Sequence, residues 1–302
     1  MPSPSADLRS LIDDVADEHA ALAAVVDPLP ESTWTTSTPS PGWTIAHQIA
    51  HLTFFDDTAT TAIVDPDRFA TQTGELLARI GAGEDMDSLT LRWADGMAPG
   101  ELAARWRANR RRLIDAARTL DDDRRIPWYG PSMGAKSFLT ARLMETWAHG
   151  QDIVDAVASL ADQSPADQPS TDRPPTDRLR HIAQLGVITR GWSYKNRGLP
   201  VPDGTVAVVL SAPSGATWTW NDDAERADTA SDASPDGDPT TGPVERISGP
   251  AEDFCLVVTQ RRHVDDTSLR VDGDLARDWM DKAQAFAGAA TDGPARAGTN
   301  SV

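Results

Sequence analysis

The sequence has almost no cysteine and almost no lysine. Cys255 is the only cysteine among 302 residues, so an internal disulfide is excluded and a reducing compartment is expected. Lysine occurs only at positions 136, 195 and 282, which leaves arginine to carry nearly all of the positive charge. Because Cys255 lies within an apolar run and no base lies near it in the sequence, we interpret it as a packed residue and not a nucleophile.

Long apolar runs and an excess of positive charge are also missing. No run approaches the about 18 to 20 residues of a membrane span, and residues 1–7 lack the basic and apolar regions of a secretory signal. The formal net charge of -18 repels nucleic-acid phosphates and anionic lipid. We therefore expect a cytoplasmic protein that binds neither nucleic acid nor membrane. The acidic, lysine-poor composition is also typical of proteins that remain soluble in concentrated salt, which we take as a hypothesis.

The first 160 residues have the apolar spacing of amphipathic helices, with apolar residues three and four positions apart. Thr44 is the expected N-cap of the second of these helices, and residues 127–134 form a loop rich in proline and glycine. Four long helices so close in sequence favour a four-helix bundle. The long helices are expected at residues 5–26, 45–55, 101–120 and 137–160, with a more polar one at 69–80.

The composition changes after residue 160, where we expect the first domain to end. Residues 161–178 are dense in Asp, Pro, Gln and Ser and are expected to be a linker. Residues 179–288 then have the pattern of a smaller α/β domain, in which 222–243 is expected to be a disordered loop; 289–302 is expected to be a disordered tail. The expected elements are helices at 179–192, 249–260 and 274–286 and strands at 205–210, 216–220 and 269–272.

Two short segments place imidazoles and carboxylates one helical turn apart. His47 and His51 lie on the second expected helix, and Glu145, His149 and Asp152 lie on the fourth. Imidazole and carboxylate bind zinc, nickel or iron, and a catalytic site keeps three protein ligands with open positions. His51, Glu145 and His149 would make such a set. By spacing alone, the same residues also fit a polar helix edge. In these two segments no glutamate lies directly beside a histidine to serve as a general base, so the pattern does not indicate a zinc peptidase.

The residues around these segments resemble a known family. Residues 41–52, PGWTIAHQIAHL, and residues 145–152, ETWAHGQD, resemble the second- and fourth-helix motifs of the DinB-like superfamily, in the branch of mycothiol-dependent maleylpyruvate isomerase. Similar motifs at 128–133, 249–254 and 260–263 extend the resemblance over nearly the whole chain. It implies a DinB-like four-helix bundle followed by a sterol-carrier-like α/β domain. It also implies a divalent metal, most often zinc, on His51, Glu145 and His149.

Four further residues are candidates for supporting roles. His47 fits a fourth ligand, a capping group, or a contact to a ligand or substrate, of which we favour the last. Asp152 fits a hydrogen bond to a ligand histidine or a solvated acid. Arg261 and Arg262 fit the substrate-carboxylate arginine that the resemblance implies, and equally fit surface pairing with nearby aspartates.

Two functions remain open at the level of the sequence. The first is a metal-dependent enzyme that activates a thiol or water, a thiol-using isomerase or transferase acting on a small organic acid or electrophile. The resemblance implies mycothiol as the thiol. The second is a non-catalytic protein that binds a small ligand and has a structural metal, which a site closed by His47 would favour. Either protein would be a monomer or a homodimer.

Overall fold

The computed structural model describes residues 4–163, 173–222 and 245–298. The chain divides into two compact units, Met1–Arg173 and Pro174–Val302. It is mostly helical with a small sheet region. Within the described residues, no helix is both long enough and apolar enough to cross a membrane. The predicted loop at 222–243 falls almost entirely, and the predicted linker at 161–178 partly, outside the described residues.

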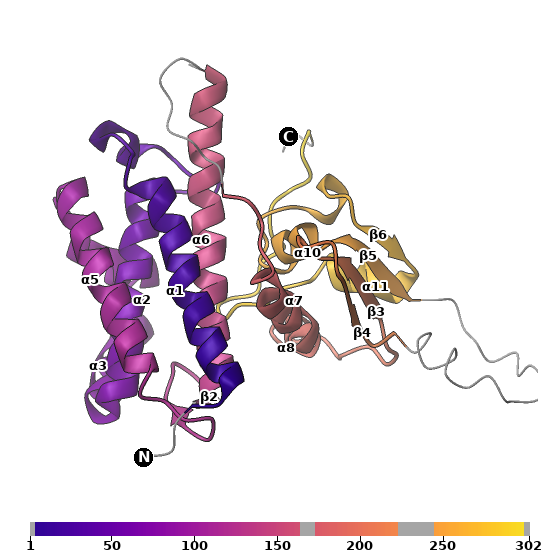
Figure 1. Ribbon diagram of the computed structural model, residues 1–302, viewed down its shortest axis with the longest axis horizontal. Coiled ribbons are helices and arrows are strands. Elements are labelled where there is room, and N and C mark those ends of the chain that lie inside the picture. Colours follow the sequence, from indigo (N-terminus) through magenta and orange to yellow (C-terminus); the bar gives the residue numbers. More distant parts are fainter. Residues whose placement is uncertain (1–3, 164–172, 223–244, 299–302) are drawn as a thin grey trace, which may run out of the picture. The chain divides into compact units, whose positions relative to one another are not determined.

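The first unit is built on four long helices that run side by side (Figure 1). In it, α1 packs on α6 and α5, and α2 packs on α5 and α6. This arrangement is the four-helix bundle that the apolar periodicity predicts. The helices are α1 (Ala6–Val26), α2 (Ile45–Val64), α5 (Pro99–Ala117) and α6 (Ala135–Gln163).

The start of α2 is fixed by a reciprocal cap that Thr44 and His47 form. The hydroxyl oxygen of Thr44 accepts from the backbone N–H of His47 at 3.3 Å, and Nδ1 of His47 accepts from the backbone N–H of Thr44 at 3.1 Å. Two of the N–H groups that a helix start leaves unpaired are thus satisfied. The prediction of Thr44 as the N-cap is confirmed.

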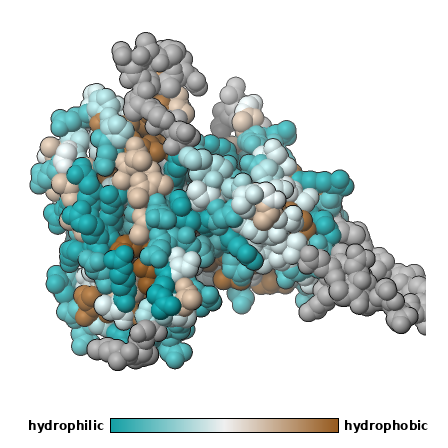
Figure 2. Space-filling view, viewed as in Figure 1, coloured by the Kyte–Doolittle hydropathy of each residue, from teal (hydrophilic) through white to brown (hydrophobic). Residues whose placement is uncertain are grey.

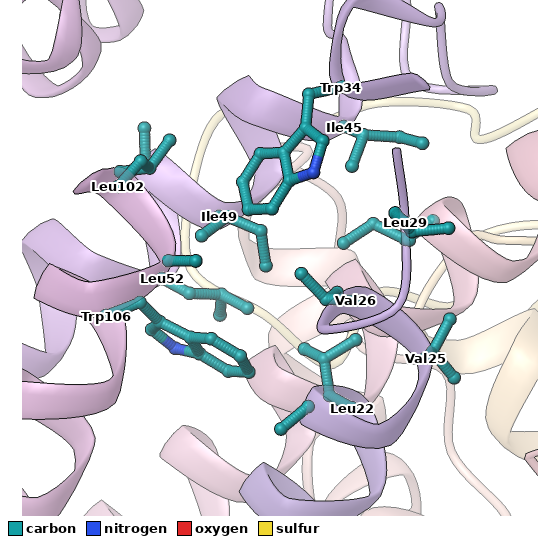
Figure 3. Packing of buried hydrophobic residues seen from close by; sticks show 14 of the residues in the cluster. Leu22, Val25, Val26, Leu29, Trp34, Ile45, Ile49, Leu52, Leu102 and Trp106 are labelled. Atoms are coloured by element: carbon teal, nitrogen blue, oxygen red, sulfur yellow. The ribbon is translucent and has the colours of Figure 1, made fainter. Parts of the chain in front are cut away.

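The bundle is held together by an apolar core from all four helices. Trp106 of α5 is fully buried, and burying a side chain of this size stabilises a fold by about 1.5 to 3 kcal/mol. Figure 3 shows these side chains pointing toward one another from different elements. The labelled members are Leu22, Val25, Val26, Leu29, Trp34, Ile45, Ile49, Leu52, Leu102 and Trp106.

Shorter elements complete the first unit. The predicted loop at 127–134 is bracketed by an antiparallel pair of two-residue strands, which the sequence analysis did not anticipate. The polar helix expected from residue 69 begins earlier, because Pro66 fits the first turn and Asp65 accepts from the N–H of Arg68 at 3.1 Å. These elements are η1 (Glu31–Thr35), α3 (Pro66–Gly81), α4 (Met86–Leu91), η2 (Arg92–Ala94), β1 (Arg125–Ile126) and β2 (Met133–Gly134).

The second unit has a four-stranded sheet in the order β4-β3-β5-β6. Strands β3 and β5 are parallel, while β4 and β6 pair antiparallel with their neighbours. The helix α10 follows β5 directly and packs on α7 and on the sheet. The elements are α7 (Leu179–Ile188), α8 (Arg190–Lys195), β3 (Ala207–Ser211), β4 (Thr217–Trp220), β5 (Arg246–Pro250), α10 (Ala251–Val258), η4 (Val264–Asp266), β6 (Arg270–Asp272) and α11 (Asp274–Met280).

Three sequence predictions for this unit were wrong. Strand β5 was missed, because its residues include only one large apolar side chain and its pairing comes from β3 and β6. The helix expected at 179–192 is two helices that divide at Thr189. The helix expected to reach Phe286 ends at Met280, since the chain turns and the N–H of Ala285 bonds to the carbonyl oxygen of Val258 at 2.8 Å.

Two of the three segments predicted to be linker, loop or tail contain residues that are held in place. In the predicted linker, Arg173 donates to the carbonyl oxygen of Trp147 at 3.0 Å and pairs with the buried Glu18. In the predicted tail, the N–H of Ala297 donates to Asp266 at 2.7 Å. Because isolated polar residues have no periodicity, composition did not reveal these long-range contacts.

Candidate metal centre

Three predicted residues converge between α2 and α6. His51 comes from α2, and Glu145 and His149 lie one turn apart on α6. Oxygen Oε2 of Glu145 lies 3.5 Å from Nε2 of His51 and 3.1 Å from Nε2 of His149. The donor atoms all lie within 4.8 Å of one another. In the described part of the chain, this is the one group of three or more His, Cys, Asp or Glu residues that is placed to hold a metal ion.

The environment of the group favours a neutral His51 and an ionised Glu145. Burial, assisted by the charge of His149, lowers the pKa of His51 to about 4. Burial by itself would raise the pKa of Glu145, but hydrogen bonds from His149 and His51 outweigh it and hold the pKa well below its ordinary value. The Glu145 carboxylate is therefore negatively charged at neutral pH and faces two imidazole nitrogens.

This donor set fits a divalent cation. Electron-rich atoms that face one another in a buried site need a positive charge between them, supplied by a proton or a metal ion. Two imidazole nitrogens and one carboxylate oxygen are a known zinc donor set with open positions. His47 is not part of the group, and its Nδ1 is occupied by the cap of α2.

Aromatic rings cover the candidate ligands. The ring of Trp43 lies 5.2 Å from the ring of His51 and is stacked on the ring of His149 at 5.7 Å. Nε1 of Trp43 donates to Asp87 of α4 at 2.9 Å, which fixes the indole. Phe55, one turn after His51, contacts the His51 ring at 4.5 Å. These rings restrict water around the site and limit the rotation of both imidazoles.

Gln48 is a further residue of the site, and the sequence analysis missed it. Its side-chain oxygen accepts a 2.5 Å hydrogen bond from Nδ1 of His149. A usable signal was present: Gln48 lies in the apolar row of α2 with Ile45, Ile49 and Leu52, and a buried amide needs partners. We interpreted that row only as packing.

The four residues predicted to support the site make contacts that agree only in part with the roles favoured from the sequence. His47 is the capping group that we had weighed and not favoured. Asp152 is bonded to Gln48 at 3.3 Å and to Ser40 at 3.0 Å, so it reaches His149 through Gln48. In the second unit, Arg261 donates to the carbonyl oxygen of Thr259 and Arg262 to that of Arg261.

Cys255 is buried, as expected for a packed residue. Burial, together with the charge of Glu252, raises the pKa of its thiol well above the ordinary value. A thiol in this state is a poor nucleophile. A thiol-dependent reaction of this protein would therefore require a thiol from outside the chain.

Fold and site together define a helical-bundle protein with a candidate metal centre between two of its helices. Residues 15–154 match the family described as the mycothiol maleylpyruvate isomerase N-terminal domain. Two uncharacterized proteins of Mycobacterium tuberculosis, from strains CDC 1551 / Oshkosh and ATCC 25618 / H37Rv, are each 40% identical over 285 residues, which cover 94% of this chain and 97% of theirs. The chain belongs to the family that carries this mycothiol maleylpyruvate isomerase domain.

Solved structures of the mycothiol-dependent maleylpyruvate isomerase are also similar to this chain. One crystal structure has 17% sequence identity and a TM-score of 0.48, and covers 84% of this chain and 89% of its own. A histidine-to-alanine variant of that isomerase has 16% identity and a TM-score of 0.49, with 85% and 90% covered.

Proposed function

We propose that this chain is a divalent-metal-dependent enzyme that uses a small thiol, an isomerase or transferase acting on a small organic acid or electrophile. The observation that carries the proposal is the partly buried group of His51, Glu145 and His149, which offers three ligand atoms within 4.8 Å of one another. A catalytic zinc has three protein ligands and keeps a position for water or substrate. The family description names mycothiol, which supports a thiol as co-substrate. The proposal includes zinc as the metal, a DinB-like bundle, and a sterol-carrier-like second unit.

His51, Glu145 and His149 would hold the ion. When bound there, a divalent ion lowers the pKa of a thiol or water ligand and so supplies a nucleophile at neutral pH. The chain contributes the rest: Trp43 and Phe55 pack against the imidazole rings and so reduce the access of water to them. Arg261 and Arg262 are the proposed groups for a substrate carboxylate, which a guanidinium binds through two hydrogen bonds.

In the isomerase reaction, the substrate and the product have the same atoms, and the thiol is regenerated. The thiol first gives up its proton, and the thiolate sulfur adds to an activated carbon–carbon double bond while the electron pair of that bond moves to the adjacent carbonyl oxygen. The remaining single bond rotates, and the electron pair returns as the sulfur leaves as thiolate. In the transferase alternative, the sulfur remains bound and the carbon next to the carbonyl takes up a proton, which gives a thioether. The substrate in either case is an electron-poor double bond or a comparable electrophile.

The position of His47 favours the enzyme over the non-catalytic alternative. A structural zinc site saturates its coordination with four protein ligands. Nδ1 of His47 accepts from the backbone of Thr44, and His47 stands outside the group of candidate ligands. A three-ligand site is the arrangement that catalysis requires.

Zinc stoichiometry of the purified full-length protein tests the proposal. We expect about one zinc per chain, lost in His51→Ala and in Glu145→Gln, because two remaining donors hold zinc weakly. His47→Ala is the control: it removes only the hydrogen bond that the His47 side chain accepts at the start of α2, and it should keep the zinc. Equal zinc in wild type and His51→Ala would refute the metal centre.

Turnover then separates the two functions. Zinc-loaded protein is mixed with mycothiol and maleylpyruvate, and the absorbance of the substrate is followed. We expect conversion that depends on both zinc and thiol. Zinc binding with no thiol adduct and no conversion, across a panel of electron-poor acids, would favour the binding protein instead.

A further inference from the structure

A chain of hydrogen bonds leads from the turn before α2 to the ring of His149. Gln48 and Asp152 are the buried links of this chain, at 0% and 2% exposure. The amide nitrogen of Gln48 donates to Oγ1 of Thr38 at 2.9 Å and to Oδ2 of Asp152 at 3.3 Å, and its oxygen accepts from Nδ1 of His149. Asp152 also accepts from Oγ of Ser40 at 3.0 Å. The chain therefore joins α2, α6 and the turn between η1 and α2.

The chemistry of these groups fixes the direction of every bond. An ionised carboxylate only accepts hydrogen bonds, so the NH₂ group of Gln48 must face Asp152. The hydroxyl of Thr38 donates to the carbonyl oxygen of Trp43 at 3.0 Å, so the Thr38 oxygen also accepts from Gln48. The carbonyl oxygen of Gln48 is thereby turned toward His149. Since that oxygen cannot donate, Nδ1 of His149 must carry the hydrogen.

We infer that Gln48 is a positioning residue that holds His149 as the Nδ1–H tautomer, with Asp152 fixing the direction of the Gln48 amide. Nε2 of His149, which lies 3.1 Å from Oε2 of Glu145, is then the ring nitrogen that would bind the metal. This inference rests on the proposed metal centre, because the tautomer matters for function only if Nε2 is a ligand.

The same reasoning separates the two histidine ligands. In the described residues, no hydrogen bond reaches Nδ1 of His51, whose ring is held by contacts with Phe55 and Trp43. His149 is held by a directed hydrogen bond as well as by stacking on Trp43. A directed hydrogen bond thus sets the tautomer of His149, whereas the rings around His51 limit its rotation without setting its tautomer.

Variants that exchange the hydrogen-bond donor and acceptor between Gln48 and Asp152 test the inference. Asp152→Asn lets the Gln48 amide face either way, and Gln48→Glu sets two carboxylates against each other. Each change should weaken zinc binding about 10- to 100-fold, measured by competition with a chelator. Combining Gln48→Glu with Asp152→Asn restores one acceptor toward His149 and one donor between the pair. We expect the double variant to bind zinc within a few-fold of wild type.

Nitrogen-15 NMR of histidine-labelled, zinc-loaded protein gives a second measurement that a merely structural role would not change. The wild type and the double variant should show a protected Nδ1–H of His149, and Asp152→Asn should lose that protection. As a matched control, we make the double variant Gln151→Glu, Asp155→Asn. These two residues of α6 share a 2.9 Å hydrogen bond that is not part of the hydrogen-bond series leading to His149. That control should keep wild-type zinc affinity.

Unchanged zinc affinity and Nδ1–H protection in Asp152→Asn would overturn the inference, as would a double variant no better than the weaker single one. If the wild type binds no zinc at all, the proposed metal centre fails separately. The tautomer of His149 is then read in metal-free protein at pH 9, above the ordinary pKa of imidazole. An Nδ1–H tautomer there would support the role of Gln48, and an Nε2–H tautomer would refute it.

Discussion

The histidines of the first unit differ in function because their nitrogen atoms have different partners. His47 uses Nδ1 to cap a helix, His149 uses Nδ1 to bond Gln48, and His51 has its Nε2 beside Glu145. His19 lies buried beside Asp56 at 3.4 Å and against Trp106. Positions 47 and 51 are both histidines, one turn apart on the same helix. Only their hydrogen-bond partners decide which imidazole is a candidate ligand.

The stability of the metal-free protein should depend on pH through His51. The pKa of His51 is about 4 in the folded protein and ordinarily 6.5, chiefly because burial disfavours the charged ring. Between these values the unfolded chain binds a proton that the folded chain does not, so stability falls as pH falls from 6.5 to about 4. Urea denaturation across this range should show a steeper loss for the wild type than for His51→Gln.

The low pKa of Glu145 affects the free energy of unfolding at more acidic pH. The ionised carboxylate stabilises the fold, and this contribution is lost only when Glu145 takes up a proton. The comparison with His51→Gln cancels the titration of the other histidines. Parallel pH profiles for the two proteins would contradict the assigned burial of His51.

At the scale of elements, α2 carries two adjacent aspartates that each pair with an arginine of another helix. Asp56 lies 2.9 Å from Arg142 of α6, with both side chains buried. Burial by itself would raise the pKa of Asp56, but His19 and Arg142 outweigh it and hold that pKa below the ordinary value. Asp57 lies 2.9 Å from Arg112 of α5, with both side chains about half exposed. The first pair joins the two helices that supply the candidate metal ligands.

Neutralising these aspartates should therefore have unequal effects. Asp56→Asn leaves Arg142 buried without its counter-charge and should lower the free energy of unfolding by about 3 to 5 kcal/mol. Asp57→Asn breaks an exposed pair and should cost about 1 kcal/mol or less. Denaturant titration of both variants measures the difference. Equal losses would mean that the Asp56–Arg142 pair is not desolvated.

The elements themselves were predictable to different degrees. Long helices repeat their apolar residues, so α1, α2, α5 and α6 could be predicted from the sequence, and the Thr44 cap with them. Strand β5 has no comparable repeat, and neither has the break at Thr189. Short elements take their conformation from neighbours in space, which a local pattern does not contain.

At the scale of the whole molecule, acidic charge dominates. The net charge is -18, and the face drawn in Figure 2 is covered mainly by hydrophilic residues with smaller hydrophobic areas between them. Excess charge of one sign destabilises a compact state by self-repulsion, and salt screens it within about 3 Å at 1 M. The composition therefore predicts a protein that is more stable in concentrated salt.

Thermal unfolding in increasing KCl tests this prediction. We expect the Tm to rise from 0.05 M to about 1 M KCl and then to level off, because screening is complete once the Debye length is a few ångströms. An uncharged osmolyte at the same osmolality is the control for effects other than screening. A Tm that is indifferent to KCl, or that falls, would remove the salt-adaptation hypothesis.

The sequence by itself determined the helical bundle, because helical periodicity is a local property, and its family resemblance singled out His51, Glu145 and His149 as candidate ligands. Only the tertiary structure decided the roles of His47, Gln48 and Asp152. Each of those roles depends on a particular hydrogen-bond partner, and for Gln48 and Asp152 that partner lies on another helix. Spacing along one helix cannot specify such a partner, so the sequence proposes the ligands and the fold decides how the side chains around them are held.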